Sequence, residues 1–364
     1  MHEHSSHTRG SSIDPPAGNG STADGDLATG TTPPQGIASE PVVLRDDPAP
    51  VRAVRAWRRA GRAEGHRHEL HPVRAVAAVA ALVALIRFLP GAAAFIAILT
   101  VLVVLHEGGH YWVARKVGMR PTEFFVGFGP TLWARTTPGG VRYGVKAVPA
   151  GGYVKIPGMG PREEVEASLE PYTYRAASRP KRLAVILAGV AVNFAVAIVI
   201  FSGFAMVGPD STANPVEAVQ HGVGTTVEVA TGTLDGLGKL VFGADDYAKS
   251  LAGGKVPENR MMSPIGGAQI ADGLLQSDPS KLLLLTGIFS ASLALLNLLP
   301  LLPLDGGHAL IVVVEAAWAR LRRRPTLRID PNRFAPVAVA VLVLLLAVSA
   351  SSMYLDILHP LTSN

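Results

Sequence analysis

The segment from Ala92 to Leu105 contains no charged side chain, and it runs directly into the sequence His106-Glu107-Gly108-Gly109-His110. A long uncharged run of this kind is typical of a membrane helix, because a helix satisfies its backbone polar groups within one segment. Ionisable side chains at membrane depth are costly unless they serve chemistry. The run therefore predicts a membrane helix that carries a functional site at one end.

The composition of the whole chain favours the same fold class. Of its 364 residues, 48% are hydrophobic and only 17% are charged, and the mean hydropathy is +0.30. In typical soluble domains, about a quarter of the residues are charged. We therefore predict an α-helical polytopic membrane protein with about five transmembrane helices, four of which form the core. The expected apolar segments are 75–89, 92–117, 183–207, 281–304 continuing as a helix to about 320, and 334–353.

The distribution of charge predicts how the chain is organised. Residues 1–51 are expected to be a disordered tail, because they are too polar to build a core, and 52–74 form a basic juxtamembrane segment. Lys and Arg are frequent in the 116–182 and 320–333 loops, which predicts that these loops and the N-terminus are cytoplasmic and that the C-terminus is extracytoplasmic. The remaining expected regions are a membrane region at 75–207, an extracytoplasmic segment with an amphipathic helix at 208–262, and a second membrane region at 263–364.

The first expected helix, 75–89, is short for a membrane crossing. Fifteen residues rise about 22 Å as a helix, less than the thickness of a bilayer core. A cytoplasmic N-terminus nevertheless requires one crossing before the helix that holds His106. We therefore predict that 75–89 crosses the membrane.

The histidine pair has the spacing of a zinc-hydrolase motif. Four residues apart on a helix, His106 and His110 leave the same face and can share one metal ion. Glu107 stands where such sites place the carboxylate that takes a proton from the attacking water. The chain has no cysteine, so zinc would have to be held by histidine and carboxylate. The alternative is a chance occurrence of the string among 11 histidines.

A second candidate segment runs from Asn297 to His308. It contains Asp305 in an apolar setting, where a carboxylate needs a partner. A catalytic zinc site needs a third protein ligand beside two histidines, and Asp305 fits that need. Pro300 and Pro303 are expected to break the helix here, which membranes tolerate where the backbone faces protein or a cavity. His308 is either a group that supports Asp305 or a plain surface histidine.

These two motifs, in this order, resemble the paired signature of the site-2 protease family. This family comprises intramembrane zinc metalloproteases, and the bacterial branch cleaves anti-sigma factors. Three further stretches, 125–130, 143–154 and 181–194, are similar to the bacterial branch, and the resemblance covers about 92–355. It implies one Zn²⁺ ion held by His106, His110 and Asp305, with Glu107 as general base. It also implies that Asn297 contacts the substrate backbone or the oxyanion.

The resemblance further implies a partner and a location. The expected substrate is a single-span transmembrane protein, for example an anti-sigma factor already trimmed by a first cleavage. The expected location is the plasma membrane of a bacterium. Gly and Pro breaks at 122–156 predict β-hairpins on the cytoplasmic side, whose edge strand pairs with the unwound substrate or which merely pack the helices. Asn193 either has a role typical of the family or is a helix-packing amide. The bilayer is the other expected partner, no nucleic acid is expected, and the oligomeric state is not given.

One departure from the family lies at 208–262. Bacterial relatives usually carry PDZ modules in this region, but the segment leaves little room for one, so we predict that the module is absent. An amphipathic helix is expected at 225–241, and Ser263-Pro264-Ile265-Gly266-Gly267 is similar to a family stretch. The departure concerns substrate selection and leaves the zinc motif intact.

Two other function classes compete with proteolysis. A zinc-binding membrane scaffold or receptor would not need Glu107, whose presence therefore argues against it. A metal transporter would need several polar residues along a path, whereas the membrane charges here converge on one depth. We therefore expect an intramembrane zinc endopeptidase, with the non-proteolytic scaffold as the alternative.

Overall fold

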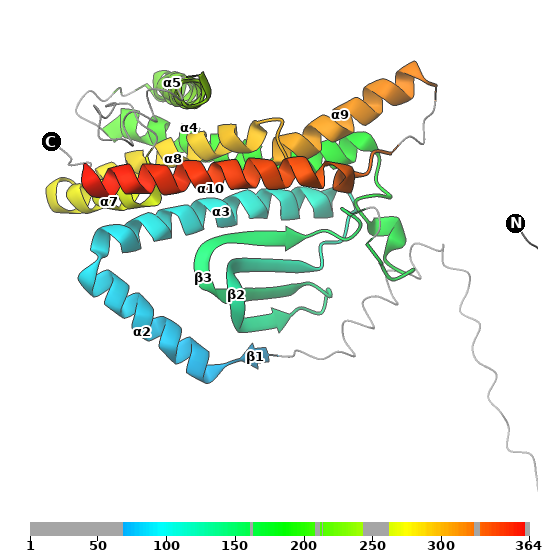
Figure 1. Ribbon diagram of the computed structural model, residues 1–364, viewed down its shortest axis with the longest axis horizontal. Coiled ribbons are helices and arrows are strands. Elements are labelled where there is room, and N and C mark those ends of the chain that lie inside the picture. The colour runs from blue at the N-terminus through cyan, green and yellow to red at the C-terminus, as the bar shows by residue number, and fades with distance from the viewer. Residues whose placement is uncertain are drawn as a thin grey trace, which may run out of the picture. The chain divides into compact units, whose positions relative to one another are not determined.

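A computed structural model describes residues 68–160, 163–207, 212, 214–242, 262–323 and 328–360. The predictions for the tail 1–51 and for most of the basic segment 52–74 lie outside the described residues. The secondary structure elements, labelled in Figure 1, are β1 (His68–Leu70), α2 (Pro72–Phe88), α3 (Pro90–Lys116), β2 (Glu123–Thr136), β3 (Arg142–Lys155), η1 (Glu170–Tyr172), α4 (Arg179–Val207), α5 (Pro215–Phe242), α7 (Pro264–Ser277), α8 (Lys281–Leu298), α9 (Asp305–Leu321), η2 (Pro331–Phe334) and α10 (Ala335–Leu358).

The helices confirm a polytopic membrane protein. Within the described residues, α3, α4, α8 and α10 are long and apolar enough to cross a membrane. Each matches one of the predicted apolar segments, although α10 runs five residues beyond the predicted end at 353. Helix α2 has 17 residues, falls short of that length, and buries none of them, so the fifth crossing stays a prediction.

The predicted break before Asp305 is present. Helix α8 ends at Leu298, α9 begins at Asp305, and six residues without helical structure lie between them. Pro300 and Pro303 lie in this connection, where proline cannot supply the backbone N–H that a continuing helix needs. The break places Asp305 in the first turn of a new helix.

Helix α4 is the centre of the packing. It contacts α3, α5, α8 and α9, while α10 lies against α7 (Figure 1). One hydrophobic core joins α3, α4 and α9 with the end of the sheet, and its members are Ala114, Met119, Ile156, Tyr174, Val185, Ile186, Ala309 and Val312. The helices that carry the two candidate motifs therefore share one core.

The sheet has three strands in the order β1-β2-β3, with β1 antiparallel to β2. Strands β2 and β3 are 14 residues each, and both pair more than once. The first half of β2 pairs in parallel with the start of β3, from Glu123↔Arg142 to Val126↔Val145. It also pairs antiparallel with the end of β3, from Glu123↔Lys155 to Val126↔Gly152. The predicted β-hairpin region is thus a compact sheet, and the end of β3 lies next to α3.

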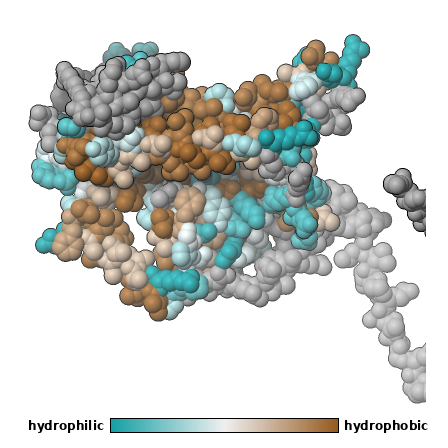
Figure 2. Space-filling model, viewed as in Figure 1, coloured by the Kyte–Doolittle hydropathy of each residue, from teal (hydrophilic) through white to brown (hydrophobic). Residues whose placement is uncertain are grey.

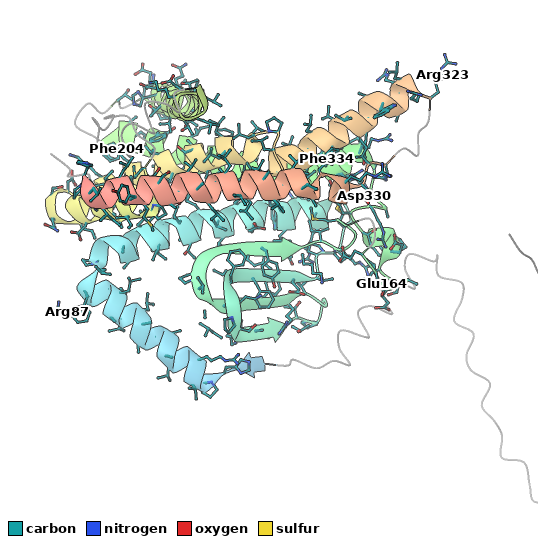
Figure 3. The ribbon with its side chains drawn as sticks, viewed as in Figure 1. Arg87, Glu164, Phe204, Arg323, Asp330 and Phe334 are labelled. Carbon is teal, nitrogen blue, oxygen red and sulfur yellow. The ribbon has the colours of Figure 1, made fainter. Side chains whose placement is uncertain are left out.

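The charged loops lie at one end of the helices. Figure 3 shows Glu164, Arg323 and Asp330 at one end and Arg87 at the other. Arg328 donates a hydrogen bond to the Ala177 carbonyl at 3.2 Å and so joins the 116–182 loop to the 320–333 loop. The two basic loops therefore share one end of the helices, which is the arrangement that the charge pattern predicts.

Two helices differ from the sequence-based expectation. Helix α5 contains the predicted amphipathic helix 225–241 but begins ten residues earlier, at Pro215. Helix α7 was not predicted; it begins after Ser263, whose side chain accepts hydrogen bonds from the backbone of Ile265 and Gly266. The rest of the segment, 208–211, 213 and 243–261, lies outside the described residues. Figure 2 shows hydrophobic residues gathered over α10 and α2, and hydrophilic residues on the side of the sheet.

Candidate metal centre

The two histidines of the motif lie on one buried face of α3. His106 and His110 are 6% and 9% exposed, and their ring centroids are 4.7 Å apart. Asp305 comes from the first turn of α9, where the helix dipole favours a negative charge. Two motifs almost 200 positions apart in the chain are thus brought together.

The three side chains converge on one point. The Nε2 atoms of His106 and His110 are 3.1 Å apart, and they lie 3.0 and 3.2 Å from Oδ2 of Asp305. A tetrahedral zinc ion with bonds of 2.0–2.1 Å separates its ligand atoms by about 3.3–3.4 Å. The cluster is therefore the right size for one zinc ion, and a His-His-carboxylate donor set suits zinc.

The hydrogen bonding of His110 supports a cation at this point. Its Nδ1 lies 2.7 Å from the Val185 carbonyl oxygen, which only accepts, so Nδ1 carries the proton. In a neutral imidazole, Nε2 then carries a lone pair and no proton. That lone pair faces the other imidazole and a carboxylate oxygen that is buried without a hydrogen-bond donor among the described residues. An electron-rich arrangement of this kind needs a positive ion at its centre.

Helix α4 approaches the histidines more closely than any side chain would permit. A Cβ atom at Gly189 would lie 2.5 Å from Nε2 of His110 and 2.7 Å from Cε1 of His106. On the facing helix α3, a Cβ at Gly109 would lie 2.8 Å from the carbonyl oxygen of Ala188 on α4. Glycine is therefore required at both positions by the contact between α3 and α4.

Asn193 lies beside the other nitrogen of His106. Its Nδ2 is 3.3 Å from Nδ1 of His106, and the residue is 0% exposed. The hydroxyl of Ser290 on α8 donates to the Asn193 backbone carbonyl at 2.7 Å. The sequence left two roles open for this residue, and the structure places it in contact with a candidate ligand.

Glu107 lies between the metal cluster and the sheet. Its carboxylate interacts electrostatically with His106, His110 and Asp305, and it accepts a hydrogen bond from the backbone N–H of Val154 on β3. A Cβ at Gly152 would lie 3.8 Å from Cγ of Glu107, so the strand runs close beside this side chain. The sheet thus reaches the candidate general base.

A network of aromatic side chains joins α3 to the sheet next to the cluster. Tyr111 follows His110, and its hydroxyl forms a hydrogen bond with the hydroxyl of Tyr143 on β3. Arg115 donates a hydrogen bond to the Tyr111 hydroxyl at 2.9 Å. On the sheet, Tyr153 donates to Glu123 at 2.9 Å. Burial raises the pKa of the Tyr153 hydroxyl, and the negative Glu123 acts in the same direction, so Tyr153 keeps its proton as the donor.

A buried ion pair holds α9 against α4 near the cluster. Arg182 Nη1 lies 2.6 Å from Oε2 of Glu315, and the two side chains are 6% and 0% exposed. The other oxygen of Glu315 accepts from the Ile329 backbone at 2.9 Å, and the Arg182 guanidinium lies over the ring of Tyr174. Because α9 begins with Asp305, this pair fixes the helix that carries a candidate ligand. Sequence analysis missed it, although a glutamate in an otherwise apolar run was a signal.

Two further residues named from the sequence make no hydrogen bond to the three side chains of the cluster among the described residues. Asn297 is half-buried in the last turn of α8, and among the described residues its side chain makes no hydrogen bond. Its contact with a substrate stays a prediction. His308 lies one turn after Asp305, is half-buried and interacts with it electrostatically, but no hydrogen bond joins their side chains.

A groove of about 1270 Å³ leads along α3 towards the cluster. Its α3 wall extends from Pro90 to Val103, and the facing walls are α7 and the tip of β3 around Pro149. Thr100 donates a hydrogen bond to the Pro149 carbonyl at 2.9 Å and so fastens the tip to α3. Val103, the last residue of α3 that lines the groove, is one helical turn before Glu107.

Comparison with known proteins places this arrangement in a family. The model of peptidase family M50 matches residues 94–346. The chain is 41% identical over 147 residues to zinc metalloprotease Rip1 of Mycobacterium tuberculosis, which covers 40% of this chain and 36% of that protein. It is 36% identical over 143 residues to the regulator of sigma-E protease RseP of Escherichia coli, covering 39% and 31%.

A longer match covers more than half of the chain. The putative zinc metalloprotease R01501 of Rhizobium meliloti is 28% identical over 334 residues, covering 64% of this chain and 87% of that protein. By contrast, the matches to Rip1 and RseP span about a third of the length of those relatives. All three relatives are named as proteases, and Rip1 and R01501 are named as zinc metalloproteases.

Proposed function

The chain belongs to peptidase family M50, and from this premise we propose that it is an intramembrane zinc endopeptidase that cleaves the transmembrane segment of single-span membrane proteins. The observation that carries the proposal is the convergence of His106, His110 and Asp305 within 3.2 Å of one another at the end of an apolar helix. Glu107 lies directly beside this cluster. A purely structural zinc site would have no use for that carboxylate.

The proposed ligands are the two histidines and the aspartate, which leave one position of a tetrahedral ion open. When bound there, zinc lowers the pKa of water and polarises the carbonyl of the scissile peptide. The protein supplies the geometry, since Val185 fixes the His110 ring and the first turn of α9 presents Asp305. Both histidines are buried, which limits the contact of these two side chains with solvent.

Glu107 is the proposed general base and acid. As a water molecule adds to the scissile carbonyl carbon, the Glu107 carboxylate takes up one of its protons. The C–N bond then breaks, and Glu107 returns the proton to the departing amine nitrogen. Water and a peptide bond are consumed, and a carboxylate and an amine are formed. The Val154 N–H that bonds to Glu107 holds the side chain in place for both transfers.

The groove along α3 is the proposed place for the substrate segment. The residues of α3 that line it lie between Pro90 and Val103, a span of about 20 Å along the helix, and most of the lining is apolar. The end of β3 pairs with β2 on one side, and its Val154 amide points to Glu107 on the other. A substrate helix that unwinds beside Gly152 would add to this edge as an extended strand, with its carbonyl groups exposed to attack.

The finer parts of the proposal concern the substrate and the location. We expect a single-span substrate, including an anti-sigma factor that a first cleavage has shortened, in the plasma membrane of a bacterium. The basic loops that share one end of the helices support a cytoplasmic position for the site. The N-terminus would then be cytoplasmic and the C-terminus extracytoplasmic.

The test is cleavage of a model transmembrane substrate by the purified full chain in detergent. Wild type is compared with Glu107→Gln, which removes the base and keeps the shape, and with Glu228→Gln, the same change at an exposed position on α5. Zinc content is measured on all three proteins. We expect cleavage by wild type and Glu228→Gln only, with one zinc ion bound in each protein.

Two outcomes would contradict the proposal. Equal cleavage by Glu107→Gln would remove the assigned role of that carboxylate. Stoichiometric zinc without cleavage of any of several single-span substrates would favour a zinc-binding scaffold.

A further inference from the structure

Three successive turns of α4 face the two histidines of the cluster. Val185 accepts the proton on Nδ1 of His110, Gly189 leaves space beside both Nε2 atoms, and Asn193 lies 3.3 Å from Nδ1 of His106. The spacing of four residues keeps all three on one face of the helix. The Nδ1 atom of each histidine, which points away from the centre of the cluster, therefore has a polar partner on α4.

The Nδ1 atoms of His110 and His106 have different kinds of hydrogen-bond partner. His110 has a backbone carbonyl, which accepts and so fixes the tautomer in which Nε2 is free to bind metal. His106 has the amide of Asn193, which can present either its nitrogen or its oxygen. In the structure Nδ2 faces the ring, while Oδ1 is buried without a hydrogen-bond partner among the described residues.

We propose that Asn193 is a positioning residue for His106, whose Nδ1 proton its side-chain oxygen accepts when Nε2 binds the metal. The proposal rests on the zinc centre proposed above. A neutral imidazole that gives the Nε2 lone pair to a metal must carry its proton on Nδ1, and that proton needs an acceptor. A half turn of the amide exchanges its oxygen and nitrogen without moving any other atom.

The surroundings of Asn193 fit this role. The residue is wholly buried, so water cannot replace the missing acceptor. Its backbone carbonyl accepts from Ser290 on α8, which fixes this turn of α4 relative to the bundle. A helix-packing amide would satisfy its own oxygen across the interface, whereas this oxygen is left without a donor until His106 supplies one.

The proposal predicts an effect on metal affinity itself. Loss of a partner that orients a metal-bound histidine typically weakens metal binding about 10- to 100-fold. Asn193→Leu has a similar volume and no acceptor, so we expect a loss within that range. Asn193→Asp keeps an acceptor of the same shape, and we expect zinc affinity equal to or higher than that of wild type.

The experiment is a competition between the purified full chain and a zinc chelator, with thermal unfolding recorded for every variant. Ser202→Ala serves as the matched control, because it removes a buried polar group from the same helix nine residues from Asn193. Asn193→Ala is a second variant without an acceptor, should the leucine variant not fold. The absorption spectrum of the cobalt-substituted protein gives a second readout, which we expect to change for Leu and Ala and not for Ser202→Ala.

The outcomes separate this inference from the zinc centre. Wild-type affinity in both Asn193→Leu and Asn193→Ala would overturn the inference and leave the centre intact. An equal loss in Asn193→Asp and Asn193→Leu would also overturn it, because packing and not the acceptor would then matter. A wild-type protein that folds and takes up no zinc would overturn the centre itself.

Discussion

Helices α4 and α10 are both long and apolar enough to cross a membrane, yet they are embedded in the molecule in opposite ways. Helix α4 packs against four other helices and buries Arg182, Asn193 and Ser202. Helix α10 lies mainly against α7, and most of its apolar side chains are exposed (Figure 1). Apolar composition thus identifies a membrane helix, whereas glycine and polar residues within it identify the face that packs and carries chemistry.

The largest expected effect comes from filling the space at Gly189 on α4. Gly189→Ala places a Cβ 2.5 Å from Nε2 of His110, and we expect loss of stoichiometric zinc binding and of any cleavage activity. Gly203→Ala is the matched change on the same helix, since a Cβ there meets nothing within 4 Å. Zinc content of the purified proteins provides the test, and full zinc in Gly189→Ala would contradict the close approach of α4.

The next effect concerns the buried pair of Arg182 and Glu315. Arg182→Met takes away the ion-pair partner of Glu315, whose side chain is 0% exposed, and we expect a loss of about 3–5 kcal/mol in the free energy of unfolding. Replacing both with Arg182→Met and Glu315→Leu should restore part of that loss, because an apolar pair of similar volume needs no partner, while the Ile329 N–H loses its acceptor. Denaturant unfolding in mixed micelles measures both. A double variant as unstable as the single one would show that the pair contributes more than mutual neutralisation.

The sequence was sufficient for the features that depend on nearby residues. The spacing of His106 and His110 predicted a shared face, and Pro300 and Pro303 predicted the helix break that places Asp305. It was insufficient for contacts between distant segments. Arg182 and Glu315 are 133 positions apart, and no local pattern pairs them.

The sheet and α7 illustrate the same limit. Alternation with Gly and Pro breaks predicted strands at 122–156, but not that the first half of β2 would pair with both ends of β3. Helix α7 contains Gly266, Gly267 and Gly273, so its helical propensity is low, and contacts with α3 stabilise it. The proposed role of Asn193 could not be predicted from the sequence, because it depends on the contact with His106 on α3.

A smaller effect is expected from the one part of α10 that resembles α4. Asp356 is wholly buried and accepts the backbone N–H of Ser263 at the start of α7, at 2.9 Å. Asp356→Ala leaves that donor without its partner, and we expect a loss of about 1–3 kcal/mol in the free energy of unfolding. Unchanged stability, measured as for the ion pair, would mean that the contact of α10 with α7 is not held by this bond.

The smallest effect is expected on the exposed part of α10. Leu344 is 59% exposed, and we expect Leu344→Ala to change the free energy of unfolding by no more than about 0.5 kcal/mol. The same type of truncation on α4, Ile186→Ala, removes a side chain that is 3% exposed and should cost about 2–5 kcal/mol. Similar losses at the two positions would remove the contrast between the helices.

X-ray absorption at the zinc edge of the purified full chain would show whether one zinc ion is held by His106, His110 and Asp305. We predict one zinc ion per chain, nitrogen and oxygen ligands at about 2.0–2.1 Å, and outer-shell scattering from two imidazoles that falls to one in His110→Ala. A folded protein without zinc, or a zinc shell that His110→Ala leaves unchanged, would contradict the account.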